Sequence, residues 1–99
     1  MSYSKRTNMI YVPGYDFAMD LQAKKMEWKR GEWYLGAKVL NFRAGAGYTK
    51  AYDANNGKLV WARSQSTPGT GGTTSTGGGL VFFGDPEGMF NAVKDDTGE

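Results

Sequence analysis

Short apolar runs separated by turn-forming residues are the main pattern of this chain. The β-branched and aromatic run at residues 9–12 ends at a Pro-Gly pair, and the run at residues 80–83 is followed by Gly and an Asp-Pro-Glu-Gly turn. Runs of this length, bounded by Gly and Pro, are typical of β-strands. Residues 88–93 return from that turn as a further strand. The pattern predicts an all-β chain that is rich in turns.

Residues 50–61 predict a β-hairpin. Its turn is Asp-Ala-Asn-Asn-Gly at residues 53–57, with short strand-like segments on both sides. Asp and Asn bond their own backbone nearby, and Gly takes a positive φ at no steric cost. The hairpin places the indole of Trp61 at a fixed distance from the small Ala51.

A related pattern recurs later in the chain. Aligning Ala51 with Ala92 brings Gly57 over Gly98, a spacing of 92 − 51 = 41 residues. Repeats of about 40–50 residues are typical of the blades of a β-propeller. The strand-like runs at residues 9–12 and 80–83 are instead 70 or 71 residues apart. About 30 extra residues must therefore form an insertion, which we place at residues 15–47.

The insertion has two interpretations. A short amphipathic helix over residues 16–30 is one interpretation. One of its faces would be formed by residues at i, i+4, i+8 and i+11, which are Phe17, Leu21, Lys25 and Trp28. The alternating apolar residues from Met26 to Leu35 favour an extended chain instead. We expect Gly45 to Gly47 to form a flexible link into the hairpin.

Composition excludes several classes of site. The 99 residues are at most one small domain, and the chain has no Cys and no His. This removes disulfides, Cys or His metal sites and His-based catalysis. A net charge of +2 is too small to imply a nucleic-acid partner. The basic residues around Trp28 are interleaved with carboxylates and predict a solvated rim. No apolar run approaches the roughly 18 residues of a membrane span, and the first twelve residues lack the apolar stretch of a signal peptide.

Three stretches are candidates for chemistry. The carboxylates Asp95, Asp96 and Glu99 cluster, but a charged turn explains them. Residues 53–57 are one residue short of a calcium loop and have no Glu at its twelfth position, so we reject that interpretation. Residues 69–79 contain six glycines among eleven residues, which is typical of a linker or of a backbone that something approaches closely. Neither nucleotide-binding glycine pattern can be drawn through them.

The two hairpin copies resemble the tryptophan-docking motif of the pyrroloquinoline quinone (PQQ) dehydrogenases, Ala-x-Asp-x-x-Thr-Gly-Lys/Glu-x-x-Trp. The first copy departs from the motif only at Asn56, where Thr is usual, and its matching residues are Ala51, Asp53, Gly57 and Trp61. The resemblance implies that the ring of Trp61 lies against the neighbouring sheet, with its N–H bonded to a backbone carbonyl.

The second copy is less complete. It has Lys94 in place of Asp and stops at Glu99, before its Trp, and its other matching residues are Ala92, Thr97 and Gly98. Three further segments are similar to the same family. Residues 1–14 resemble one of its strands, residues 19–42 a long irregular excursion, and residues 71–88 a glycine loop in which residues 73–76 begin the innermost strand of a blade.

The resemblance implies about two antiparallel blades of an eight-bladed quinoprotein propeller, as an incomplete fragment. The first blade would occupy residues 1–63, with the insertion at 15–47, and a truncated second blade would occupy residues 64–99. Met1 would then be an internal residue of a longer protein. Tyr11, Ala51 and Trp61 should belong to the first sheet, and Val81 and Ala92 to the second.

The resemblance also implies a function. Family members are periplasmic enzymes that oxidise alcohols (CH–OH donors) and pass the electrons to a quinone or cytochrome acceptor. They hold PQQ, with a calcium or lanthanide ion, in the central funnel. In this chain Thr70, Gly71 and Gly72 match the loop that faces the funnel, whereas the metal ligands and the catalytic base lie outside it. The partners would be the remaining blades, a small alcohol and a cytochrome, and the chain alone is expected to be inactive.

Two alternatives belong to other classes. One is a non-catalytic propeller-repeat scaffold, such as a protein of outer-membrane assembly that shares the repeat. The other is a free-standing interaction module, which the two abrupt ends disfavour. The insertion and the glycine loop favour the dehydrogenase, because plain scaffold repeats would keep the 41-residue period.

Overall fold

The computed structural model describes residues 1–69 and 71–99, and these residues form seven strands and no helix. The predicted all-β class is therefore confirmed. The strands are β1 (Ser2–Ser4), β2 (Met9–Ala23), β3 (Ala37–Asp53), β4 (Leu59–Gln65), β5 (Thr73–Ser75), β6 (Leu80–Gly84) and β7 (Phe90–Lys94).

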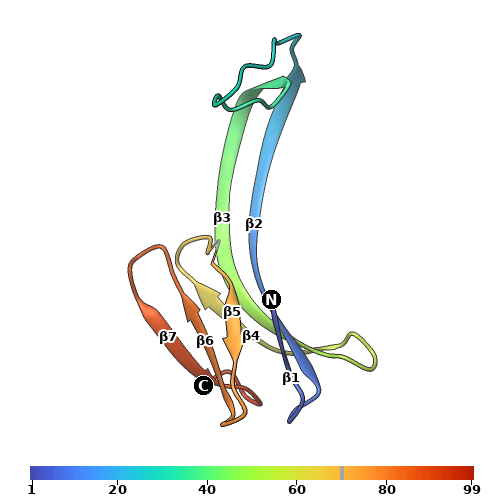
Figure 1. The fold of residues 1–99 in the computed structure, drawn as a ribbon, viewed down its shortest axis with the longest axis vertical. Helices are drawn as coiled ribbons and strands as arrows, with labels where there is room; N and C mark the ends of the chain where they lie inside the picture. The colour runs from blue at the N-terminus through green and yellow to red at the C-terminus, as the bar shows by residue number, and fades with distance from the viewer. Residues whose placement is uncertain (70) are drawn as a thin grey trace.

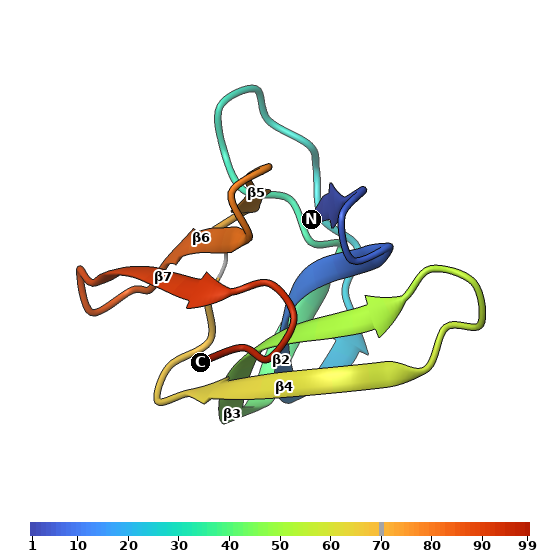
Figure 2. The ribbon, with the colours of Figure 1, turned by 90° about the horizontal axis from the view of Figure 1, so that it is seen from below.

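The strands form two antiparallel sheets, one with the order β1-β2-β3-β4 and one with the order β5-β6-β7. Figures 1 and 2 show the second sheet beside the lower part of the first, with β5 close to β1. The expected division of the hairpin residues between two sheets is confirmed. The proposed boundary between residues 63 and 64 stays a prediction, since β4 continues to Gln65 and β5 begins only at Thr73.

The insertion is a long two-stranded ribbon. β2 and β3 pair from Met9 opposite Asp53 to Ala23 opposite Ala37, with two register shifts along the way. The part beyond Tyr15 projects away from the rest of the molecule (Figure 1). The expected irregular excursion is wrong for residues 19–23 and 37–42, which lie in β2 and β3, whereas residues 24–36 between them form neither strand nor helix. The helical alternative for residues 16–30 is also wrong. The expected flexible link at residues 45–47 is also wrong, because these glycines lie within β3.

The ribbon forms because its two faces differ in polarity. Residues opposite each other on an antiparallel pair share a face. One face is apolar, with Phe17, Met19 and Leu21 beside residues of β3 that include Phe42, whose ring centroid lies 5.6 Å from that of Phe17. On the other face, the Asp20 carboxylate accepts a hydrogen bond of 2.9 Å from the Asn41 amide. Phe17 and Leu21 fit a period of two as well as they fit helical spacing, which is why the sequence allowed both.

Gly45 explains the bend at the base of the ribbon. The register shifts between Tyr15 and Phe17, where a β-bulge places one residue of β2 against two of β3. A Cβ atom on Gly45 would overlap the carbonyl oxygen of Asp16. Only glycine fits this position without a backbone shift.

The core lies between the two sheets. Each sheet contributes three buried side chains, and these six are Tyr11, Ala51, Trp61, Val81, Phe83 and Val93. Each sheet thus covers one face of the other. The outer face of the second sheet is apolar and largely exposed, and the half-buried ring of Phe82 stacks there on the exposed ring of Phe90, with centroids 5.6 Å apart.

Candidate functional site

The first hairpin turn is closed by two backbone hydrogen bonds. The N–H of Asp53 donates to the Lys58 carbonyl at 2.9 Å, and the N–H of Gly57 donates to the Asp53 carbonyl at 2.8 Å. The Asp53 carboxylate also accepts from the N–H of Asn55 at 2.7 Å. Gly57 has φ +70°, a conformation that side chains on an L-residue disfavour. These contacts explain why the turn has Asp at residue 53 and Gly at residue 57.

The second turn repeats this geometry 41 positions later. The N–H of Lys94 donates to the Glu99 carbonyl at 2.8 Å, and the N–H of Gly98 donates to the Lys94 carbonyl at 2.9 Å. Gly98 has φ +75°. Lys94, which replaces the Asp of the motif, pairs instead with the Glu99 carboxylate at 3.1 Å. The sequence repeat is therefore a repeat of backbone structure.

Asn56 and Thr97 occupy equivalent positions in the two turns. The Asn56 Oδ1 accepts a hydrogen bond from the N–H of Lys58 at 2.8 Å, and the Thr97 Oγ1 accepts one from the N–H of Glu99 at 3.5 Å. Either side chain can present an oxygen to the N–H two residues later. Asn at position 56 thus preserves the contact that Thr makes in the other copy.

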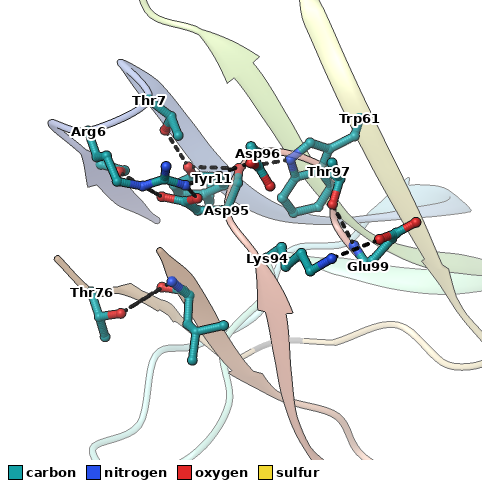
Figure 3. A network of polar contacts seen from close by, with 12 residues as sticks. Arg6, Thr7, Tyr11, Trp61, Thr76, Lys94, Asp95, Asp96, Thr97 and Glu99 are labelled. Atoms are coloured by element: carbon teal, nitrogen blue, oxygen red, sulfur yellow. Dashed lines mark hydrogen bonds and ion pairs between the residues drawn. The ribbon is translucent and has the colours of Figure 1, made fainter. Parts of the chain in front are cut away.

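Trp61 joins the first sheet to the second turn. Its indole N–H donates to the backbone carbonyl of Asp95 at 3.1 Å (Figure 3). Its ring lies so close to Gly98 that a Cβ there would be 2.7 Å from Cε3. Trp61 is only 9% exposed, and its partner residue in the β3–β4 register is Ala51. A small residue opposite and a glycine beneath leave room for the indole.

Asp95 is the polar centre of the contact between the sheets. Its carbonyl also accepts from the Tyr11 hydroxyl at 3.0 Å, while its fully buried carboxylate accepts from the Ser4 hydroxyl at 3.1 Å and from the Arg6 guanidinium through Nε at 3.2 Å and Nη2 (Figure 3). The hydrogen bond to Asp95 raises the pKa of Arg6, and burial raises the pKa of Tyr11. Both groups keep their donating protons throughout the physiological pH range.

The sequence did not assign this role to Asp95. The clustered carboxylates have different environments in the structure. Asp95 is buried, Asp96 is exposed with its carboxylate 3.9 Å from the Arg6 guanidinium, and Glu99 pairs with Lys94. Arg6 is 89 positions away from Asp95. No local signal connects them.

The glycine loop exposes bare backbone. Gly71 and Gly72 are exposed, and a Cβ on Gly72 would face open space. A cleft of about 270 Å³ is lined by Gly71, Gly84, Asp85 and Pro86. Thr70, which we expected to contact a cofactor, lies outside the described residues. A glycine backbone without side chains suits the close approach of a flat ligand, so the loop fits a planar cofactor.

The carboxylate beside this cleft serves the β6–β7 turn. Asp85 accepts hydrogen bonds from the N–H groups of Met89 at 2.9 Å and Glu87 at 3.1 Å, and from the Asn91 amide at 3.2 Å. These bonds, chiefly that from Met89, lower the pKa of Asp85. Within residues 1–69 and 71–99, no three acidic side chains gather into a group that could hold a metal ion. The described part of the chain therefore offers no set of metal ligands.

Known proteins are similar to this chain in sequence and in fold. No family model matches the chain. It is 38% identical to the quinoprotein alcohol dehydrogenase PedH of Pseudomonas putida, an alignment that covers all of this chain and 17% of PedH. It is 35% identical to the lanthanide-dependent methanol dehydrogenase of Methylacidiphilum fumariolicum, over 99% of this chain and 17% of that enzyme.

A solved structure shows the same architecture. The quinohemoprotein alcohol dehydrogenase ADHIIG of Pseudomonas putida HK5 superposes with a TM-score of 0.82 at 27% identity, over all of this chain and 17% of that one. The chain thus spans about one sixth of the length of the relatives it matches. Its two sheets correspond to a segment of a quinoprotein dehydrogenase fold. Over its whole length, the chain is similar to the quinoprotein alcohol and methanol dehydrogenases, and the resemblance seen in the sequence is confirmed.

Proposed function

We propose that this chain is part of a PQQ-dependent dehydrogenase that oxidises alcohols and passes the electrons to a quinone or cytochrome acceptor. The observation that carries the proposal is the alignment of the entire chain, ribbon and glycine loop included, with quinoprotein alcohol dehydrogenases at up to 38% identity. One relative is named as a methanol dehydrogenase linked to cytochrome c. A plain scaffold repeat would need neither the ribbon nor the loop.

In this proposal, the Trp61 contact is the tryptophan docking that joins one propeller blade to the next. Its supports are the bond to the Asp95 carbonyl, the packing on Gly98 and the shared geometry of the two turns. The exposed apolar outer face of the second sheet supports further blades, because an apolar patch of this kind is normally covered. Its residues are Leu80, Phe82, Phe90 and Ala92.

The glycine loop would contact the cofactor. PQQ, when bound, supplies the electron-accepting chemistry that amino-acid side chains lack. The backbone of Gly71 and Gly72 would lie against it, and Thr70 would stand beside it. A calcium or lanthanide ion would be held by residues of the rest of the enzyme, and two relatives are named as lanthanide-dependent.

The proposed enzyme is periplasmic and receives a small alcohol from solution. Its partners would be the remaining blades and a cytochrome. In the part of the chain that the structure describes, no helix has the length and apolarity of a membrane span.

The test uses the full-length protein that contains this chain. The apoprotein is loaded with PQQ and either calcium or lanthanum, and the reduction of an artificial electron acceptor by a primary alcohol is followed. We expect turnover only when PQQ and one of the two ions are both present. The apoprotein with ion alone is the matched control. Absence of turnover with either ion, in a preparation that binds PQQ, would argue for a different substrate class, and absence of PQQ binding would refute the proposal.

A further inference from the structure

We propose that Thr73 is a positioning residue, which holds the glycine loop at the place where its backbone meets the cofactor. The inference rests on the proposed function. It concerns a residue that touches neither the cleft nor the turns, but which follows Gly72 directly and is the first residue of β5.

The hydroxyl of Thr73, in the second sheet, forms hydrogen bonds with residues of the first sheet. It donates to the carbonyl of Tyr11 in β2 at 3.2 Å, and it lies 3.0 Å from the hydroxyl of Ser2 in β1. A hydroxyl has one proton and two lone pairs. Since the Thr73 proton goes to Tyr11, Ser2 donates to Thr73. The side chain is 8% exposed, so water does not compete freely for these bonds.

These side-chain hydrogen bonds matter because β5 forms no backbone β-pairing with the first sheet. β5 pairs only with β6, although it lies beside β1 and β2. Besides Thr73, the hydroxyl of Ser75 donates to the Tyr3 carbonyl at 2.7 Å. Two hydroxyl-to-carbonyl bonds, from alternate residues of one short strand, thus join it to the neighbouring sheet.

The bonds of Thr73 and Ser75 differ in their distance from Gly71 and Gly72. A Cβ added to Gly71 would lie 3.6 Å from the Gly84 carbonyl oxygen, and a Cβ added to Gly72 would have no atom within 4 Å. Thr73 is therefore the first residue after Gly71 and Gly72 with a buried side chain, whereas Ser75 is two residues further on and only half-buried. A shift of the Thr73 backbone moves Gly72 directly. Displacements of about 1 Å can change ligand placement enough to alter reactivity strongly.

The experiment measures PQQ binding in the full-length apoprotein, by titration followed through the absorbance of the bound quinone. Thr73→Val keeps the shape of the side chain but removes the donor. Thr73→Ser keeps the hydroxyl. Ser75→Ala is the matched control, because it removes the same kind of bond between the same two sheets.

We expect Thr73→Val to raise the Kd for PQQ by about tenfold or more. A change of this size corresponds to the loss of one buried hydrogen bond. Thr73→Ser and Ser75→Ala should stay within about twofold of the unsubstituted protein. If Thr73→Val does not fold, Ser2→Ala replaces it. That variant removes the donor to Thr73 and should weaken PQQ binding in the same direction.

Three outcomes would overturn the inference. Unchanged PQQ binding in Thr73→Val, or in Ser2→Ala where it is the substitute, would show that the anchor does not position the loop. Equal weakening in Thr73→Val and Ser75→Ala would show a general effect of joining the sheets. An unsubstituted protein that binds no PQQ would instead refute the proposed function on which the inference rests.

Discussion

Gly98 and Gly57 illustrate two different reasons why a position in a protein requires glycine. Both have a positive φ, of +75° and +70°, but a Cβ on Gly98 would be 2.7 Å from the Trp61 ring, whereas one on Gly57 would meet nothing within 4 Å. Gly57→Ala should therefore cost only backbone strain, about 1–2 kcal/mol. Gly98→Ala should cost about 1–3 kcal/mol more, because it also overpacks the indole contact.

Urea denaturation of the two variants, followed by tryptophan emission, checks this difference. Equal losses of unfolding free energy would show that the indole moves away from Gly98 at no cost. A larger loss for Gly57→Ala would contradict the predicted order.

Asp85 predicts a dependence of stability on pH. Its pKa is lowered below the usual value of about 4 by the N–H of Met89 and its other donors. A carboxyl group whose pKa falls on folding contributes stability above its unfolded pKa, and this contribution is lost as the pH falls through the folded pKa. Asp85→Asn should therefore lower the urea midpoint at pH 6 and should lower it less at pH 2.5. An equal decrease at both pH values would show that the ionised form contributes nothing.

At the residue scale, the sequence predicted the contacts that are local. The turn at residues 53–57 could be predicted because Asp and Asn bond backbone groups only two or three positions away. The partner of Asp95 could not be predicted, since Arg6 comes from the other end of the chain. Asp95 and Asp96 look alike in the sequence, and only the packing of the two sheets buries the first and exposes the second.

At the scale of elements, the ribbon should be separable from the core. None of the six core residues lies between residues 16 and 46. Replacing residues 16–46 with an Asn-Gly turn joins Tyr15 to Gly47, which are already paired across the two strands. We expect the shortened chain to keep Trp61 buried, with a change in unfolding free energy of about 1 kcal/mol or less, as is usual away from a core.

The emission spectrum gives a direct measurement, because Trp61 is the one tryptophan of the three that the shortened chain keeps. The matched control is the full chain with Trp28→Ala and Trp33→Ala, which also leaves only Trp61. The two spectra should coincide. A red shift in the shortened chain alone would show that the ribbon helps to hold the sheets together.

The elements differed in how well they could be predicted. The strands at residues 9–12 and 80–84 follow from dense apolar runs between turn signals. The length of β2 and β3 could not be predicted, because an exposed strand is stabilised mainly by pairing with its neighbour, and the pairs here lie up to 44 positions apart, as between Met9 and Asp53. The bulge at Gly45 was read as a flexible link for the same reason.

At the scale of the whole molecule, the isolated 99-residue chain should bind no PQQ stoichiometrically and should not oxidise alcohols, even with PQQ and calcium supplied. Its described part contributes only an open cleft and a glycine backbone toward a cofactor, and no group of acidic residues that could hold a metal. Incubation with PQQ, gel filtration and the absorbance of the protein peak provide the measurement. Co-elution of one PQQ per chain, or dye reduction above a control without protein, would contradict this prediction.

The arrangement of two sheets was predictable because a 41-residue spacing leaves room for one small sheet per repeat. The glycine loop is a different case. The sequence singled out its glycines, but their role depends on what faces them across a funnel that this chain would only partly surround. The assignment of Gly71 and Gly72 therefore stays a prediction, as does that of Thr70.

The position of Trp61 also bears on the order of events during synthesis. The ring is made 98 − 61 = 37 residues before the glycine on which it packs. At translation rates of about 5–20 residues per second, Gly98 is synthesised roughly 2–7 seconds after Trp61. Before Asp95 is made, the indole N–H of Trp61 and the hydroxyl of Tyr11 lack their shared acceptor, the Asp95 carbonyl. The first sheet can pair its strands on the ribosome, but it reaches its final packing only when the next turn has emerged.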